Sequence, residues 1–156
     1  MSVIAPGTPA PEFRLATDSG GTLTLGDVRG QTTVLVFFPF AFSPVCTDQF
    51  NVYQEVLDEL EAQGAKLYGV SCDATWSLKA FRKSLGVTIP MLSDFEPKGE
   101  VCRAFGVYHP GGFPHRAIVI IDPEGRVRWS YEAPDPGELP GANLIFDGLA
   151  AERPVG

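Results

Sequence analysis

The sequence predicts an α/β fold in which a central mixed β-sheet is flanked by helices. Runs of β-branched and aromatic residues alternate along the chain with longer segments whose apolar residues recur at helical spacing. Glycine follows both of the longer helical patterns, as is common at the end of a helix. The chain has 156 residues, of which 44% are hydrophobic and 20% charged. We therefore expect residues 1–156 to form one domain with a hydrophobic core of its own.

The first elements expected are strands. Residues 13–15 and 22–25 alternate between apolar and polar side chains and flank the turn 18–21, so they predict an N-terminal β-hairpin. Residues 33–38, Thr-Val-Leu-Val-Phe-Phe, form a continuous apolar run that is typical of a strand buried on both faces. Pro39 ends this strand.

Helices and strands then alternate. The expected elements are a helix at 48–63, a strand at 65–72, a helix carrying Leu78, Phe81 and Leu85, an extended segment at 88–92, a short helix at about 97–105, strands at 117–121 and 126–131 joined by a tight turn, and a final helix at 138–151. This order is compatible with the thioredoxin fold, in which a mixed sheet has helices on both faces.

Charge and composition narrow the function classes. The formal net charge of −7 argues against nucleic acid as a partner, because binding to phosphate draws on clustered Lys and Arg. The longest apolar stretch, residues 33–42, is too short to span a bilayer, and residues 1–11 lack the features of a signal peptide. Three cysteines, an odd number, fit a reducing compartment better than a secreted disulfide scaffold. We therefore expect a cytoplasmic protein with no nucleic-acid or membrane partner.

Cys46 is the residue whose position is best suited to chemistry. It lies in a proline-containing segment where the buried strand gives way to the first long helix, and active-site loops of open α/β sheets occur at the carboxyl ends of strands. A thiol in the first turn of a helix faces unpaired backbone N–H groups and the positive end of the helix dipole, which favour the nucleophilic thiolate. The alternative is a cysteine buried only for packing.

The sequence around Cys46 carries a resemblance to a known family. Residues 37–50, Phe-Phe-Pro-Phe-Ala-Phe-Ser-Pro-Val-Cys-Thr-Asp-Gln-Phe, resemble the active-site loop of peroxiredoxins, whose Pro-x-x-x-Thr/Ser-x-x-Cys signature is matched by Pro39, Ser43 and Cys46. The resemblance continues, in the family's order, through residues 69–73, 90–94, 103–107 and 116–122. It implies a thioredoxin-like fold and a thiol-dependent peroxidase that reduces hydrogen peroxide and organic hydroperoxides through a sulfenic acid at Cys46.

The same resemblance implies a role for each residue of the site. Cys46 corresponds to the peroxidatic cysteine, Pro39 shields it from water, and Ser43 offers its hydroxyl to the bound peroxide. Arg116 supplies positive charge to the thiolate and the substrate, although a surface charge at the start of a strand is the alternative for this residue. Ser43 replaces the family's usual Thr but keeps the hydroxyl donor. Gln49 stands where relatives often carry a Glu or Gln that hydrogen-bonds the arginine.

The remaining cysteines bear on how the oxidised thiol is reduced. A thiol–disulfide oxidoreductase of the same fold normally needs Cys-x-x-Cys, but Ser43 occupies the first of those positions. A resolving cysteine five residues beyond the peroxidatic one would fall at Asn51, and there is no C-terminal Val-Cys-Pro. The chain is therefore most similar to the alkyl hydroperoxide reductase E, or one-cysteine, branch. Cys72 and Cys102 are left as candidates, of which Cys102 is the better because Lys98 lies one turn before it.

We expect an external thiol as the reductant, either thioredoxin, a glutaredoxin-like protein or a low-molecular-weight thiol. By the family resemblance we also expect a homodimer or a higher homo-oligomer. No cofactor or metal is expected, since His109 and His115 have no Cys or carboxylate beside them in the sequence. The alternative function is a thiol-based redox sensor or chaperone-like binder on the same fold. Catalytic consumption of peroxide with a thiol reductant would distinguish the enzyme from that alternative.

Overall fold

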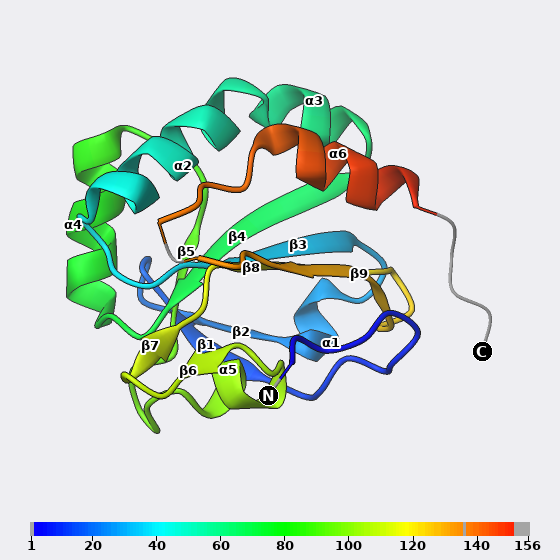
Figure 1. Ribbon diagram of the computed structural model, residues 1–156, viewed down its shortest axis with the longest axis horizontal. Coiled ribbons are helices and arrows are strands. Elements are labelled where there is room, and N and C mark those ends of the chain that lie inside the picture. Colours follow the sequence, from blue (N-terminus) through cyan, green and yellow to red (C-terminus); the bar gives the residue numbers. More distant parts are fainter. Residues whose placement is uncertain (1, 136, 152–156) are drawn as a thin grey trace.

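The computed structural model describes residues 2–135 and 137–151, which pack around one mixed β-sheet (Figure 1). The strand order is β2-β1-β5-β4-β3-β8-β9. The strands are β1 (Arg14–Thr17), β2 (Thr22–Thr24), β3 (Thr32–Phe37), β4 (Ala65–Ser71), β5 (Met91–Ser93), β8 (Ala117–Ile121) and β9 (Val127–Glu132), with β6 (Tyr108–His109) and β7 (Phe113–Pro114) in a separate hairpin. The central strands β3, β4 and β5 are parallel, and the outer pairings are antiparallel. The mixed sheet and the N-terminal hairpin are those that the sequence predicted.

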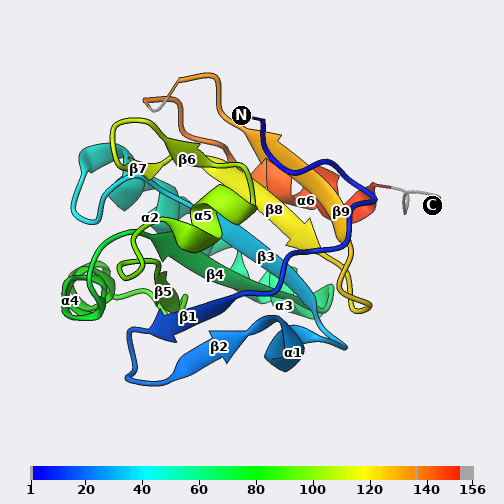
Figure 2. The ribbon, with the colours of Figure 1, turned by 90° about the horizontal axis from the view of Figure 1, so that it is seen from below.

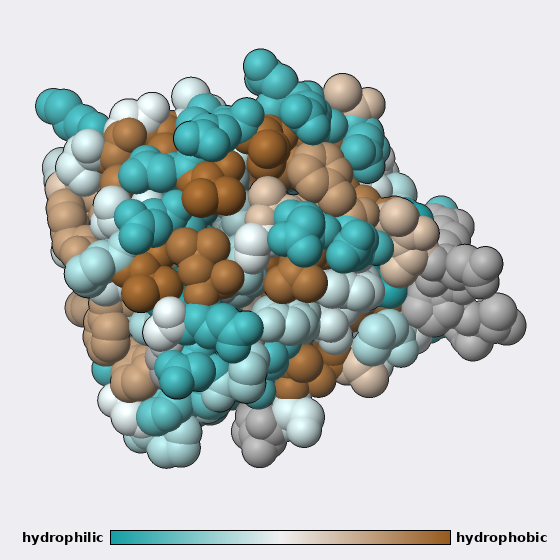
Figure 3. Space-filling view, turned by 45° about the horizontal axis from the view of Figure 1, so that its top comes forward, coloured by the Kyte–Doolittle hydropathy of each residue, from teal (hydrophilic) through white to brown (hydrophobic). Residues whose placement is uncertain are grey.

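Helices cover both faces of the sheet (Figures 1 and 2). One face carries α2 (Pro44–Glu55), α3 (Leu57–Ala62), α4 (Thr75–Leu85) and α6 (Ala142–Ala150), and the other carries α1 (Leu25–Val28) and α5 (Glu100–Ala104). Over α2, α3 and α6 the surface is a mixture of apolar and polar side chains (Figure 3). None of the helices in the described ranges has both the length and the hydropathy needed to cross a bilayer.

The buried strand β3 divides the core into two parts. Successive side chains of a strand point to opposite faces of the sheet. Val34 and Val36 accordingly pack with α2, α4 and α6, whereas Leu35 and Phe37 pack on the face of α5. All four are fully buried, which explains why this strand reads as a continuous apolar run. The prediction of a strand buried on both faces is confirmed.

The ends of the helices differ from the sequence prediction. The helix expected at 48–63 starts earlier, at Pro44, because proline lacks an N–H and is tolerated in the first turn of a helix. It is also divided at Val56, whose φ of −110° and ψ of 9° lie outside the helical region, so α3 follows as a separate element. The helix expected at 97–105 is limited to α5.

The C-terminal helix starts later than predicted. The pattern placed it at 138–151, but α6 begins at Ala142 after an N-cap at Gly141. Pro140 accounts for the difference, because its ring disfavours helical backbone in the residue before it. The sequence analysis also missed α1, although Thr24 and Asp27 form a capping box at its start, and it missed the hairpin of β6 and β7.

A glycine in β4 allows α2 to lie close to the sheet. A Cβ atom at Gly69 would lie 2.8 Å from Cζ of Phe50 in α2 and 2.7 Å from Sδ of Met91 in β5. These separations are shorter than ordinary van der Waals contact. The missing side chain therefore fixes the distance between α2 and the sheet.

We expect the substitution Gly69→Ala to lower the free energy of unfolding by about 1–3 kcal/mol, because the added methyl group overpacks this contact. Gly21→Ala is the matched control, since its Cβ would meet only Oγ1 of Thr17, at 3.6 Å. The control should change the free energy by less than about 0.5 kcal/mol. Urea-induced unfolding measures both values. Equal stabilities of the two variants would show that α2 does not depend on this close approach.

Candidate active site

The loop between β3 and α2 is held by backbone hydrogen bonds and contains one strained residue. Its Phe38 N–H donates to the carbonyl of Val70 at 3.0 Å, which extends the pairing with β4 beyond the strand. Phe42 has a φ of 69°, in the left-handed region that favours glycine. Such a conformation costs about 1–3 kcal/mol and persists only where the surroundings hold it, often at functional sites. The turn at Phe42 leads directly into Ser43, the N-cap of α2.

Cys46 lies in the first turn of α2, at the junction between strand and helix where the sequence placed it. The helix begins at Pro44, so Cys46 is its third residue, and its side chain is fully buried. The first N–H groups of a helix have no intrahelical acceptor, and the helix dipole is positive at this end. The backbone around Cys46 therefore favours negative charge on the sulfur.

Four buried side chains form a continuous hydrogen-bonded chain at the site. Arg116 Nη1 donates to Cys46 Sγ at 3.3 Å and to Gln49 Oε1 at 2.6 Å. Gln49 Nε2 donates to the hydroxyl of Tyr53 at 2.9 Å, and that hydroxyl donates to the carbonyl of Pro140 at 2.7 Å. Hydrogen bonds from a charged donor are stronger than neutral ones, and a low dielectric strengthens them further. The arrangement places the positively charged guanidinium against the sulfur of Cys46.

The spacing of these residues explains why they meet. Residues three, four and seven apart share one face of a helix, so Cys46, Gln49 and Tyr53 of α2 face the same side. Arg116 directly precedes β8, whose first residue, Ala117, pairs with the last residue of β3. The backbone carbonyl of Arg116 also accepts a hydrogen bond from the Ala133 N–H at 2.8 Å. Strand pairing thus holds Arg116 beside the point at which β3 leads to α2.

Tyr53 belongs to this network, although the sequence analysis assigned it only to the apolar face of a helix. Burial raises the pKa of Tyr53 above its ordinary value, so its hydroxyl stays protonated and can donate to Pro140. Its position four residues after Gln49 is the signal that could have revealed it, since polar side chains at this spacing can hydrogen-bond on a helix. Tyr53 connects the site to the segment that precedes α6.

Ser43 and Pro39 lie in the same loop but make no hydrogen bond to Cys46. Ser43 Oγ is buried and has no hydrogen-bond partner among the described residues. Pro39 is buried two residues after the end of β3 and borders a pocket that also contains Cys72. Between them, the Ala41 N–H donates to Oδ2 of Asp73 at 2.9 Å. No sequence pattern indicates this role of Asp73 in holding the loop.

Fold and site together define a thiol enzyme of the thioredoxin-fold class, and comparisons with known proteins agree. The model of the AhpC/TSA family matches residues 6–130. Alkyl hydroperoxide reductase E of Mycobacterium tuberculosis is 34% identical over 147 residues, which cover 93% of this chain and 95% of that protein. A peroxiredoxin of Thermotoga petrophila is 35% identical over 130 residues, covering 78% of this chain and 60% of the relative.

Solved structures show the same similarity. AhpC of Enterococcus faecalis superimposes with a TM-score of 0.85 at 27% identity, over 96% of this chain and 92% of that one. Peroxiredoxin Q of Xanthomonas campestris gives a TM-score of 0.76 at 28% identity, over 88% and 87% of the two chains. The chain therefore belongs to the AhpC/TSA family, the peroxiredoxins, and is a thiol-dependent peroxidase.

From the hydrogen-bonded chain we predict that the Tyr53 hydroxyl stabilises the folded protein. Tyr53→Phe leaves Gln49 Nε2 and the Pro140 carbonyl without this partner in a buried site, so the free energy of unfolding should fall by about 1–3 kcal/mol. Tyr68→Phe is the control, because the Tyr68 hydroxyl makes no hydrogen bond within the described residues, and it should be nearly neutral. Denaturant titration measures both. A Tyr53→Phe protein as stable as the control would show that the hydroxyl contributes nothing to the network.

Proposed function

We propose that the protein reduces hydrogen peroxide and organic hydroperoxides, with the Cys46 thiolate as the attacking group. The observation that supports this most directly is the hydrogen bond from the Arg116 guanidinium to the buried Cys46 Sγ, at the start of α2. A thiolate held by a cation at a helix N-terminus is the reactive form of cysteine. The similarity to alkyl hydroperoxide reductase E supports the same substrate class.

The proposed reaction is a displacement at oxygen. The Cys46 thiolate attacks the terminal oxygen of the hydroperoxide, so that an S–O bond forms and the O–O bond breaks. Cys46 becomes a sulfenic acid, and the departing alkoxide takes up a proton to leave as an alcohol, or as water when hydrogen peroxide is the substrate. Negative charge moves from sulfur to the leaving oxygen in this step. Donors fixed at the site stabilise that charge without reorganising.

The other residues of the site have supporting roles in this proposal. Arg116 stabilises the thiolate and the charge that develops on the peroxide. Ser43 donates its hydroxyl to the bound peroxide, and its buried Oγ with no partner among the described residues is consistent with a donor that serves a ligand. Pro39 excludes water from the thiolate. Gln49 positions the guanidinium, because its Oε1 accepts from Arg116 Nη1 at 2.6 Å, a shorter contact than the 3.3 Å between that nitrogen and Cys46 Sγ.

We propose an external thiol as the reductant of oxidised Cys46. Cys46 belongs to the core on the α2 face of the sheet, whereas Cys72 and Cys102 belong to the core on the α5 face. A disulfide needs Cα atoms within about 7 Å and side chains directed at each other. An external thiol instead condenses with the sulfenic acid, releasing water, and a second thiol reduces the mixed disulfide to regenerate Cys46. Thioredoxin, a glutaredoxin-like protein and a low-molecular-weight thiol all supply this chemistry.

We also propose that the protein forms a homo-oligomer and is located in the cytoplasm. Phe40 and Phe42, in the loop that precedes Cys46, expose 49% and 55% of their surface. Large exposed aromatic side chains are typical of protein interfaces. They support a homodimer or a higher homo-oligomer. The three cysteines, all free thiols, support a reducing compartment and hence the cytoplasm.

One equivalent of hydroperoxide should convert the reduced protein to a sulfenic acid at Cys46 that dimedone traps and mass spectrometry locates. Cys46→Ser should abolish both the adduct and peroxide turnover with a thiol reductant, because serine is not a comparable nucleophile. Cys72→Ser is the control and should retain both. Substantial turnover by the Cys46→Ser protein would refute Cys46 as the attacking group, and an intramolecular disulfide from Cys46 would refute the external reductant.

A further inference from the structure

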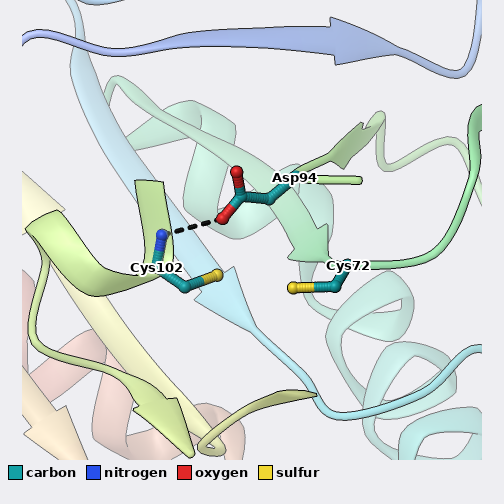
Figure 4. Close-up of side chains that lie close together, drawn as sticks. All are labelled: Cys72, Asp94 and Cys102. Carbon is teal, nitrogen blue, oxygen red and sulfur yellow. Dashed lines mark hydrogen bonds between the residues drawn. The ribbon is translucent and has the colours of Figure 1, made fainter. Parts of the chain in front are cut away.

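A second pair of thiols lies on the opposite face of the sheet from Cys46. Cys72 follows the carboxyl end of β4, and Cys102 lies in α5. Their Sγ atoms and a carboxylate oxygen of Asp94 all lie within 4.8 Å of one another, and the two sulfurs point toward each other (Figure 4). The mechanism proposed for Cys46 uses none of these groups. Two thiols so close together can form a disulfide after small side-chain movements.

Asp94 fixes this arrangement from the end of β5. Its N–H donates to the carbonyl of Ser71 at 2.7 Å, which holds it beside the end of β4. Its two carboxylate oxygens accept from the N–H groups of Val101, at 3.2 Å, and Cys102, at 2.8 Å. The thiols are therefore brought together by a dedicated set of hydrogen bonds between β4, β5 and α5.

The two thiols differ in access and in acidity. Cys102 is fully buried, whereas Cys72 is 9% exposed and lines an open pocket together with Phe40, Phe95 and Lys98. The neighbouring Cys102 thiol lowers the pKa of the Cys72 thiol. The neighbouring Cys72 thiol, together with burial, raises the pKa of Cys102. Cys72 is thus the more accessible and the more acidic thiol, and Cys102 lies behind it.

We propose that Cys72 and Cys102 form a dithiol–disulfide exchange centre whose oxidant is a disulfide. The Cys72 thiolate attacks one sulfur of the disulfide and releases the first thiolate. Asp94 accepts the proton of Cys102, whose sulfur then attacks Cys72 and releases the second thiolate. The proton passes from Asp94 to solvent. In total two protein thiols become one disulfide, and one external disulfide becomes two thiols.

Asp94 is suited to the proton step. Burial raises the pKa of Asp94 above its ordinary value, which makes its carboxylate a stronger base. It lies within reach of the Cys102 sulfur, the thiol that must lose a proton. A divalent metal held by the same three side chains is the competing outcome, because thiolates and carboxylates are also ligands for zinc. Lys98 at the pocket places a cation near Cys72 and favours the metal-free dithiol.

The centre can be tested independently of Cys46 in the Cys46→Ser protein. Treatment with bis(2-hydroxyethyl) disulfide, followed by an acid quench and alkylation under denaturing conditions, should give a mass loss of two hydrogens and a linked Cys72–Cys102 peptide. Dithiothreitol should reverse the change. Two thiols that stay fully alkylatable would overturn the proposal. The proposal would also be overturned if the protein bound one Zn²⁺ and the bound metal protected both thiols from oxidation. Neither result depends on the role of Cys46.

The order of attack follows from two further variants of the Cys46→Ser protein, each checked for its fold by circular dichroism. Cys102→Ala should accumulate a mixed disulfide at Cys72, because the second thiol is missing. Cys72→Ala should leave Cys102 unmodified, because Cys102 is buried. A mixed disulfide at Cys102 in preference to Cys72 would overturn the assignment.

The role of Asp94 has its own readout. In Asp94→Asn the mixed disulfide at Cys72 should accumulate near neutral pH and resolve as the pH rises, because hydroxide then removes the proton of Cys102. If Asp94→Asn resolved the mixed disulfide at the same rate as the protein with Asp94 at every pH, Asp94 would not be the group that accepts the proton of Cys102.

Discussion

The contact between the Arg116 guanidinium and the Cys46 sulfur is the interaction on which the site depends. A buried charge without partners is strongly unfavourable, so a fully enclosed arginine requires acceptors at defined positions. Two of them come from α2, as Cys46 Sγ and Gln49 Oε1. Because Gln49 is neutral, it holds the guanidinium in place without neutralising its charge. The positive charge is then directed at the sulfur, where a thiolate is stabilised.

The rest of the fold serves to hold this contact. Arg116 is fixed by the pairing of β8 with β3, and Cys46 is fixed because α2 starts where β3 ends. The absence of a side chain at Gly69 lets α2 lie close to the sheet, and Tyr53 ties the helix to the segment before α6. The contact thus depends on the relative placement of two strands and one helix.

The same sheet separates two kinds of thiol chemistry. Cys46 lies among the helices of one face, next to an arginine, whereas Cys72 and Cys102 lie on the other face, next to a carboxylate. A cation suits the thiolate that we propose attacks peroxide, and a carboxylate suits the proton transfer that we propose for disulfide exchange. The loop before Cys46 is nevertheless tied to the second centre, since Ala41 is hydrogen-bonded to Asp73, the neighbour of Cys72.

The sequence predicted the strands better than the helix ends. The continuous apolar run at 33–38 indicated a strand buried on both faces, and the consecutive residues of the motif around Cys46 are the basis on which we propose it as the reactive thiol. The break at Val56 and the late start of α6 depend on backbone angles and on Pro140, which apolar periodicity does not register. The pairing of Cys72 with Cys102 could not be predicted, because it is brought about by Asp94 and by the neighbouring ends of β4 and β5.

The most direct test of this account is the rate at which Cys46 reacts with peroxide when Arg116 is replaced. Stopped-flow measurements on Arg116→Gln and Arg116→Lys, with folding verified by thermal unfolding, isolate the guanidinium from the rest of the site. Losing a charge-assisted hydrogen bond of about 1.5–3 kcal/mol predicts a rate that is slower by about tenfold or more in Arg116→Gln. Arg116→Lys should fall between this variant and the unmodified protein, since it keeps the charge but not the planar fork of donors. Folded variants that both react as fast as the unmodified protein would contradict the central role of Arg116.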